Sequence, residues 1–314
     1  MDLNATTLAR AAVATAMAAV TSCGGPDPKP LARRAADVVA LAVDDVNVYW
    51  LESVPSGSLM KLPVAGGMPT TLASGQVGSG ALAIDSKRVY WTNTSSGTVL
   101  SVEKTGGAPV VLADALQTPR AIAVSGDEVF WAGANDSTIL KTQTVPGTAP
   151  SLVTQESLHD VRAIAVDANN LYWVETIPGL VMARPRSADV ALSSTVLSTQ
   201  QDGPIDIAVD STHVYWANAF NGGAISSMPK NGSGAARVLG ARNGEPNGLA
   251  IDGENAYWIG TSRGFVGRVP LAAGTATILA TVSNPFAIAV SQSSVLFATH
   301  EQDGVTSTIE MLAK

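Results

Sequence analysis

Seven segments of the chain alternate small and large apolar residues and place an aromatic pair a few positions later. The first segment runs Ala-Leu-Ala-Val-Asp over residues 40–44 and continues to Val48-Tyr49-Trp50. Alternation with a period of two is typical of β-strands, and the Gly, Pro, Asn and Asp residues between the segments are typical of turns. The last aromatic position of the seven segments is occupied by Trp50, Trp91, Trp131, Trp173, Trp216, Trp258 and Phe297.

These aromatic positions recur at intervals of 39 to 43 residues, the length of one four-stranded propeller blade. Each unit resolves into four short strands with turn residues between them. We therefore predict an all-β fold, a seven-bladed β-propeller of four-stranded antiparallel blades. An aspartate ends the first strand of five units, where its side chain can bond the backbone of the following turn. We expect a structural role for these five residues: Asp44, Asp85, Asp167, Asp210 and Asp252.

The seventh unit ends at Lys314 after its third strand and so lacks a fourth. Near the N-terminus, Lys29-Pro30-Leu31-Ala32 matches the phrase that forms the fourth strand elsewhere. We expect this segment to complete the last blade, which would close the ring and remove an exposed sheet edge. The predicted propeller spans residues 29–314.

The N-terminal residues indicate export. An uncharged run over residues 11–20 has the length of a signal-peptide core and is too short to span a bilayer. Val20-Thr21-Ser22-Cys23 resembles the lipobox of bacterial lipoproteins, which implies a signal peptide over residues 1–22 and lipidation of Cys23. Residues 23–28 would be the lipidated cysteine and a flexible linker. The alternative is an Ala-rich cytoplasmic helix with an incidental cysteine.

By the same resemblance, Gly24 lacks the aspartate that signals inner-membrane retention. The expected location is the outer membrane or the cell surface. The alternative is a secreted or periplasmic protein. The lipid anchor would be the only contact with the membrane.

Composition excludes several function classes. Only 14% of residues are charged, against about 25% in an average domain, and the net charge is −7. An acidic protein with few cations is poorly suited to phosphate backbones, so we expect no nucleic-acid partner. One cysteine allows neither an internal disulfide nor a cysteine-based zinc site. All six Trp and five Tyr lie in the repeated phrases, so none remains as a stacking platform.

The repeated Ile-Ala-Val-Asp and Val-Tyr-Trp phrases resemble the YWTD repeats of low-density-lipoprotein-receptor propellers. The segments that begin at Pro119 and Pro285 are similar to NHL-type repeats. The resemblance covers the whole mature chain and implies a β-propeller of that superfamily. YWTD propellers have six blades, and the Thr-Asp of their motif is absent here, so no ligand-binding residue is carried over. Streptogramin-lyase-like propellers are seven-bladed, and in them His and Glu on one face perform metal-assisted chemistry.

Candidate binding residues lie in the loops after strand two and at the start of strand one, which share one face of a propeller. We call it the rim face. The eight residues that we expect to form a ligand-binding rim are Glu52, Asn93, Arg120, Arg162, Glu175, Asn218, Asn247 and Arg263. Further polar or aromatic members of these loops are Asn135, Asp136, Asn221 and Phe286.

Two of the three histidines fall in the two longest irregular loops, over residues 155–160 and 299–304. His300, Glu301 and His159 are therefore weak candidates for a general base or a metal ligand. Ordinary loop polarity is the favoured interpretation, and no confident metal site is predicted.

The sequence favours a noncatalytic binding or scaffold module for a protein, peptide or glycan ligand at the rim face, with no cofactor. We expect a monomer. The alternative is a metal-dependent propeller lyase or lactone hydrolase, similar to streptogramin lyases or gluconolactonases. Its divalent metal would be held by Glu52, Glu175, Asn218 and His300.

Overall fold

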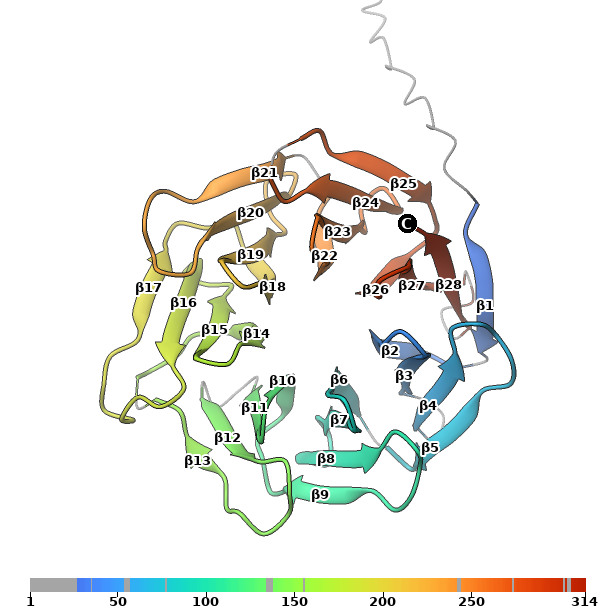
Figure 1. Ribbon diagram of the computed structural model, residues 1–314, viewed down its shortest axis with the longest axis horizontal. Helices are drawn as coiled ribbons and strands as arrows, with labels where there is room; N and C mark the ends of the chain where they lie inside the picture. Colours follow the sequence, from blue (N-terminus) through green and yellow to red (C-terminus); the bar gives the residue numbers. More distant parts are fainter. Residues whose placement is uncertain are drawn as a thin grey trace, which may run out of the picture.

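A computed structural model describes residues 27–34, 36–53, 57–76, 78–133, 138–154, 156–241, 244–272, 274–301, 303 and 306–314. In these ranges, seven four-stranded antiparallel sheets surround a central axis, with no helices between them (Figure 1). The predicted seven-bladed, all-β propeller is confirmed. Membrane-spanning helices are absent from this part of the chain. The predicted signal peptide and Cys23 lie outside the described residues.

Strand one of each blade lies nearest the axis, and strand four lies at the outside (Figure 1). Blades 1 and 2 are formed by β2 (Val38–Val43), β3 (Asn47–Glu52), β4 (Ser58–Pro63), β5 (Thr70–Ser74), β6 (Ser79–Ile84), β7 (Arg88–Asn93), β8 (Thr98–Glu103) and β9 (Val110–Ala113). Blades 3 and 4 are formed by β10 (Pro119–Ser125), β11 (Glu128–Gly133), β12 (Ile139–Gln143), β13 (Ser151–Leu152), β14 (Val161–Val166), β15 (Asn170–Glu175), β16 (Leu180–Pro185) and β17 (Thr195–Ser198).

Blades 5 and 6 are formed by β18 (Pro204–Val209), β19 (His213–Asn218), β20 (Ala224–Pro229), β21 (Arg237–Ala241), β22 (Pro246–Ile251), β23 (Asn255–Gly260), β24 (Phe265–Pro270) and β25 (Thr277–Thr281). Blade 7 combines both ends of the chain: β26 (Pro285–Val290), β27 (Ser294–His300), β28 (Ser307–Ala313) and β1 (Lys29–Arg34).

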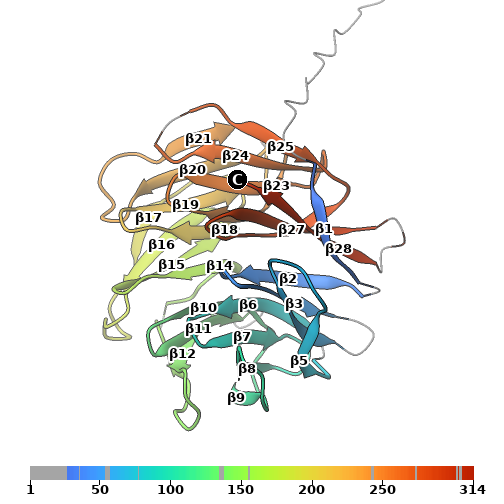
Figure 2. The same cartoon turned by 45° about the vertical axis from the view of Figure 1, so that its right-hand side comes forward.

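The N-terminal strand closes the ring as predicted. Strand β1 pairs antiparallel with β28, from Lys29 opposite Met311 to Arg34 opposite Ser307. Figure 2 shows β1 lying alongside β28 at the outer edge of blade 7. Because β1 supplies the fourth strand, the last blade has the same four-stranded sheet as the other six.

Aromatic side chains of strand two fill the boundaries between blades. Consecutive residues of a strand point to opposite faces, so the Tyr and the Trp of one blade reach different neighbours. Tyr215 of blade 5, for example, packs in one cluster with Trp258 of blade 6, while Trp216 packs with Tyr172 of blade 4. One such cluster occupies each of the seven boundaries, and the six Trp side chains are at most 2% exposed.

The five aspartates that end strand one have the structural role expected from the sequence. In each, Oδ1 accepts hydrogen bonds from two backbone N–H groups of the following turn, and Oδ2 accepts one from the tyrosine hydroxyl of strand two. These tyrosines are Tyr49, Tyr90, Tyr172, Tyr215 and Tyr257. Each aspartate therefore fixes its turn and orients an aromatic ring in the blade boundary.

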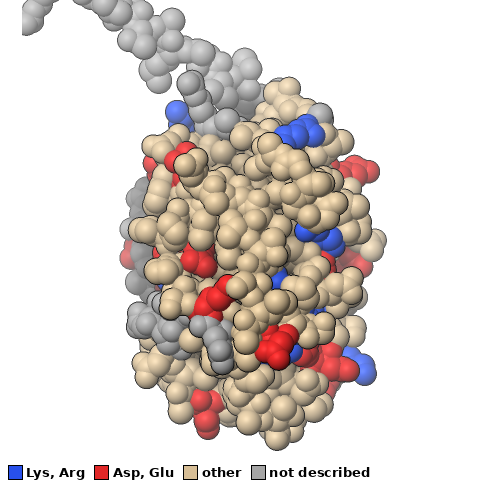
Figure 3. Space-filling model, turned by 90° about the vertical axis from the view of Figure 1, so that its left-hand side faces the viewer, with Lys and Arg blue, Asp and Glu red and all other residues tan. Residues whose placement is uncertain are grey.

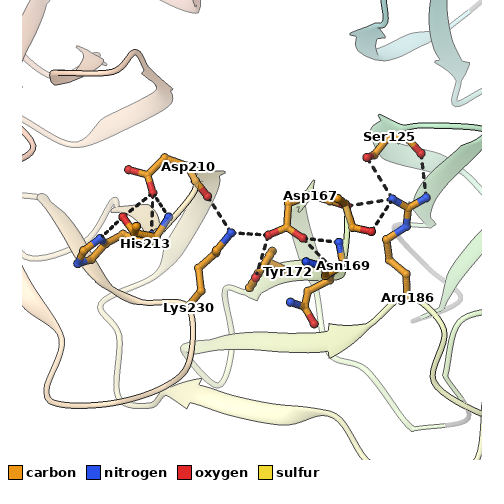
Figure 4. Close-up of polar contacts among 11 residues, drawn as sticks. Ser125, Asp167, Asn169, Tyr172, Arg186, Asp210, His213 and Lys230 are labelled. Carbon is orange, nitrogen blue, oxygen red and sulfur yellow. Dashed lines mark hydrogen bonds and ion pairs between the residues drawn. The ribbon is translucent and has the colours of Figure 1, made fainter.

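Cations from the next blade bind several of these turns. Lys230, which follows strand three of blade 5, donates to Asp167 of blade 4 at 2.6 Å and to the backbone carbonyl of Asp210 at 2.9 Å. Arg186 of blade 4 donates to the Ser125 hydroxyl and carbonyl of blade 3 at 3.1 and 2.8 Å (Figure 4). Lys104 and Lys314 bind aspartates of blades 1 and 6 in the same way. We call these contacts the interblade ties.

The outer strands β5, β9, β13, β17 and β25 contain no charged residue, whereas the closing strand β1 contains Lys29, Arg33 and Arg34. Figure 3 shows scattered acidic and basic groups on the side that contains β17. Five outer strands each expose one apolar side chain: Val111, Leu152, Val196, Val238 and Ile278. The low charge content thus reflects both the buried blade boundaries and a weakly charged outer edge.

Candidate binding site

A β-bulge near the start of strand one directs one residue of every blade toward the axis. The pairing register between strands one and two shifts immediately after the first residue pair in all seven blades. A bulge leaves a residue unpaired and turns its side chain away from the regular pleat. In blades 2 and 6 the third residue of strand one, Ala81 or Gly248, is also unpaired. The unpaired second residues of strand one are Val39, Gly80, Arg120, Arg162, Ile205, Asn247 and Phe286. We call these seven residues the channel ring.

The channel ring lines a cavity of about 350 Å³ on the axis. Val38, which precedes the bulge in blade 1, pairs with Glu52 at the end of strand two. The ring therefore lies on the rim face, where strand one starts and strand two ends. Of the predicted rim residues, the structure brings Arg120, Arg162 and Asn247 together in this one cavity.

Two neighbouring blades contribute arginines to the ring. Arg120 Nη2 donates to Asp160 Oδ1 at 3.0 Å, and Arg120 Nε is buried without a hydrogen-bond partner among the described residues. Arg162 is exposed, and its pKa is lowered by partial burial and by the positive charge of Arg120, an effect that Asp160 partly opposes. Asp160 is thus paired with Arg120, and the second guanidinium group, that of Arg162, lies near both without a direct contact to either.

The other side of the ring is mainly apolar. Phe286 stacks on His300 with ring centroids 3.8 Å apart and an interplanar angle of 18°. Around the ring, β26 of blade 7, which carries Phe286, lies between β22 of blade 6 and β2 of blade 1 (Figure 1). The channel mouth therefore has a cationic side at blades 3 and 4 and an apolar side at blades 7 and 1.

Asp206 is a second acidic group in the channel wall. Its Oδ1 accepts a hydrogen bond from the N–H of Ile207 at 2.8 Å, and its Oδ2 accepts one from Leu249 of blade 6 at 2.7 Å. Burial raises the pKa of Asp206 to about 6, although both hydrogen bonds oppose that rise. This carboxylate is held by backbone groups and does not pair with either arginine.

Two predicted rim carboxylates accept hydrogen bonds from tryptophan indoles. Glu52 Oε1 accepts the Nε1–H of Trp50 at 2.9 Å and the Nε–H of Arg34 at 2.7 Å. Glu175 Oε1 accepts the Nε1–H of Trp173 at 3.0 Å. Both glutamates are more than nine-tenths buried. Each therefore satisfies a buried indole whether or not a ligand reaches the rim.

Two predicted rim amides take part in the same arrangement through a glutamine. Gln76 Oε1 accepts the Trp91 indole N–H at 2.9 Å and the Asn93 amide at 3.0 Å. Gln201 does the same for Trp216 and Asn218, at 2.7 and 3.1 Å. Neither glutamine was predicted from the sequence. The signal that could have identified them is their common spacing, because each lies fifteen residues before its tryptophan.

Arg263 lies apart from the channel. With Asn221, it lines a separate cavity of about 310 Å³ on the loops between blades 5 and 6, whose other lining residues include Glu245 and Ser262. Nearby, the rim face also exposes two large apolar side chains, Ile177 at 67% and Phe220 at 53%. The sequence analysis missed both because it searched these loops for polar groups. Asn135 and Asp136 lie outside the described residues.

The three weak catalytic candidates have separate partners. His159 is 68% exposed, with Nδ1 3.7 Å from Glu175. His300 Nδ1 lies 3.4 Å from an Asp37 oxygen, and the Glu301 carboxylate forms two 2.6 Å hydrogen bonds with Arg33 of the closing strand. No three His, Cys, Asp or Glu side chains gather into a metal-binding group within the described ranges.

Comparisons with known proteins agree with the repeat and the ring. The sequence model for the low-density lipoprotein receptor repeat class B matches residues 87–124. The amino-acid sequence matches none of the curated proteins with which it was compared. A crystal structure of a nidogen/laminin complex contains a chain that is 21% identical, with a TM-score of 0.55 over 66% of this chain and 80% of that one.

Two lyase structures are similar over nearly the whole chain. A streptogramin B lyase is 12% identical, with a TM-score of 0.74 over 92% of this chain and 97% of that one. A catalytically inactive virginiamycin B lyase from Staphylococcus aureus, solved with quinupristin, is 13% identical, with a TM-score of 0.73 over 91% and 98%. At these identities the likeness concerns the fold alone. The chain is a seven-bladed β-propeller built from YWTD-like repeats.

Proposed function

We propose that this protein is a noncatalytic binding module that holds a protein or peptide ligand at the mouth of its central channel. The observation that carries the proposal is the channel ring, in which bulges direct two arginines, an asparagine and a phenylalanine into one cavity. Arginine and aromatic side chains are enriched among residues that dominate binding energies at protein interfaces. Exposed Ile177 and Phe220 add apolar area on the same face.

The contacts of the other candidates support binding over catalysis. Glu52, Glu175 and Asn218 belong to three different blades, and each takes part in the hydrogen bonding of a buried tryptophan. His300 stacks on a channel residue at the closure of blade 7. The four side chains considered for a divalent metal therefore each have a partner near their own blade, and the proposed binding requires no cofactor.

The proposed location is outside the cytoplasm. The lipobox-like sequence before Cys23 supports a lipid-anchored propeller that presents its rim face to other envelope components. Incorporation of radiolabelled palmitate, lost in Cys23→Ala, would test the anchor directly.

Site-specific photocrosslinking in intact cells tests the binding face. A photoreactive benzoylphenylalanine in place of Asn247 should form a discrete adduct with one protein or peptide, identified by mass spectrometry. The matched control places the same residue at Lys87, in an exposed turn at the opposite end of strands one and two. Adducts of equal yield from both positions, or adducts from Lys87 alone, would contradict the proposed face.

A further inference from the structure

We propose that the channel ring binds a carboxylate group of an acidic peptide through Arg162 and Arg120, with an apolar group of the same ligand against Phe286. This inference rests on the proposed binding function and names the chemistry of the ligand. It follows from the charges, the hydrogen bonds and the apolar surface at the channel mouth.

The cationic side of the mouth has one positive charge in excess. Asp160 forms an ion pair with Arg120 at 3.0 Å, whereas Arg162 makes no hydrogen bond or ion pair within the described part of the chain. Two like charges held near each other in a partly enclosed cavity raise the local positive potential. A monoanion at Arg162 would balance this charge, and the neighbouring Arg120 guanidinium adds a second positive group at the same cavity.

The neighbouring acids favour a monoanion over a dianion. Asp160 stands beside the arginines, and Asp206 also lines the channel. A phosphate dianion would be repelled by both carboxylates, whereas a carboxylate brings one charge. A carboxylate also matches the planar donor fork of a guanidinium group, which can bind both of its oxygens.

The apolar side of the ring selects a ligand with a hydrophobic part. Strand β26 of blade 7 lies across the axis from β10 and β14 of blades 3 and 4 (Figure 1), and Phe286 lines the same cavity as the two arginines. Outside the cavity, Ile177 and Phe220 are exposed on the loops of blades 4 and 5. An acidic peptide can supply both a carboxylate and apolar side chains. An acidic sugar lacks the apolar part, and the Trp and Tyr rings on which it could stack are buried.

Titration with small probes tests the carboxylate site. The probe is 3-phenylpropionate, which joins one carboxylate to one phenyl ring, and 3-phenylpropionamide is its neutral counterpart. NMR of the arginine Nε–Hε groups should show saturable shifts for Arg120 and Arg162 with the acid only. Loss of the charge-assisted hydrogen bonds in Arg162→Met should weaken the affinity about tenfold. Arg162→Lys, which keeps the charge without the planar fork, should bind with intermediate affinity.

The matched control is Arg263→Met, because Arg263 is an exposed rim arginine outside the channel. It should leave the affinity for 3-phenylpropionate unchanged, and all variants should keep the wild-type melting temperature. Equal binding of the neutral amide, or an equal loss in Arg263→Met, would overturn the site. Tighter binding of inorganic phosphate or glucuronate than of 3-phenylpropionate would overturn the assignment to an acidic peptide.

Crosslinking separates this inference from the function on which it rests. If the Asn247 adduct disappears when Arg162→Met is added, both are supported. If the adduct persists unchanged, the binding function stands and the carboxylate site is wrong. If no adduct forms in the parent protein, the proposed function itself fails.

Discussion

In blades 1, 2, 4 and 5, the indole N–H of the strand-two tryptophan has its acceptor in one of two arrangements. Where strand two ends in glutamate, as at Glu52 and Glu175, the carboxylate two residues after the tryptophan accepts directly. Where it ends in asparagine, as at Asn93 and Asn218, a glutamine accepts from both side chains. An indole can only donate, and in these four blades the residue at the end of strand two determines which acceptor serves. Strand two of blade 3 ends in Gly133, and there the Trp131 indole N–H is buried without a hydrogen-bond partner among the described residues.

Removal of a shared acceptor should therefore destabilise the fold. Gln201→Ala leaves the Trp216 indole and the Asn218 amide without their common acceptor. Because unsatisfied buried donors lose their hydration without compensation, we expect the free energy of unfolding to fall by about 2 kcal/mol. Urea denaturation measures the change, with Gln292→Ala, at an exposed turn, as the control. Equal stability of the two variants would refute the role given to Gln201.

Some of these contacts can be anticipated from the sequence and others cannot. Residues two apart on a strand share a face, so the contact between Trp50 and Glu52 follows from strand periodicity. Gln76 reaches Trp91 from a loop fifteen residues earlier, and no local rule places it there. The channel ring depends on a shift of pairing register. Sequence analysis therefore assigned Arg120, Arg162 and Asn247 to the rim face, where the structure places them in one cavity. It passed over Val39 and Ile205, whose apolar side chains gave no functional signal.

At the scale of elements, the two ends of strand one have different roles. The bulge at its start places residues in the wall of the channel. The aspartate at its other end accepts hydrogen bonds from the turn that leads to strand two. The interblade ties then join that turn to the next blade. Asp167 shows the consequence: burial would raise its pKa, but hydrogen bonds from Lys230 and from the N–H groups of Asn170 and Asn169 outweigh burial and lower it.

The ties make stability depend on pH in a definite direction. The pKa values of Asp44, Asp167 and Asp252 lie below their ordinary value in the folded chain, so unfolding favours their protonation. Their contribution is present above the ordinary aspartate pKa, about 4, and is lost as the pH falls through the lowered values. We therefore expect the free energy of unfolding to decrease as the pH falls below about 4.

The substitution Lys230→Met removes one interblade tie, the contact between Lys230 and Asp167. The ion pair with Asp167 is four-fifths buried on both sides, and we expect its loss to cost about 1 kcal/mol at pH 7. The variant should also lose less stability than the wild type between pH 7 and pH 3, because Asp167 no longer has its lysine partner. Thermal unfolding at several pH values measures both effects, with Lys87→Met as the exposed control. Parallel pH profiles for Lys230→Met and the wild type would contradict this assignment.

At the scale of the whole molecule, the ring is closed by sequence-distant ends. The repeat pattern predicted this closure. The seventh repeat lacks a fourth strand, which would leave an unpaired sheet edge, and Lys29-Pro30-Leu31-Ala32 matches the sequence of the fourth strand in other repeats. The structure adds side-chain contacts at the junction: Leu31 packs against the cluster around Trp50, Arg33 binds Glu301, and Arg34 binds Glu52. The closing strand thus also fixes the positions of Glu301 and Glu52 on the rim face, and it packs in the same cluster as Phe286.

Deletion of the closing strand should weaken the entire ring. A chain without residues 1–34 loses the pairing of β1 with β28 and exposes that edge to intermolecular pairing. We expect the melting temperature to fall by about 10 °C, with higher oligomers in size-exclusion chromatography. The control lacks only residues 1–26 and should melt like the full chain. If the two truncated chains melt alike as monomers, closure by β1 is not required for stability.

The central claim is that the channel ring, rather than the carboxylates at the ends of strand two, receives the ligand. A crystal structure determined with 3-phenylpropionate tests this claim most directly. We expect a carboxylate within hydrogen-bonding distance of the Arg162 guanidinium, about 3 Å, and a phenyl ring on the side of Phe286. The probe bound at Glu52 or Glu175, or a channel without the probe at saturating concentration, would contradict it.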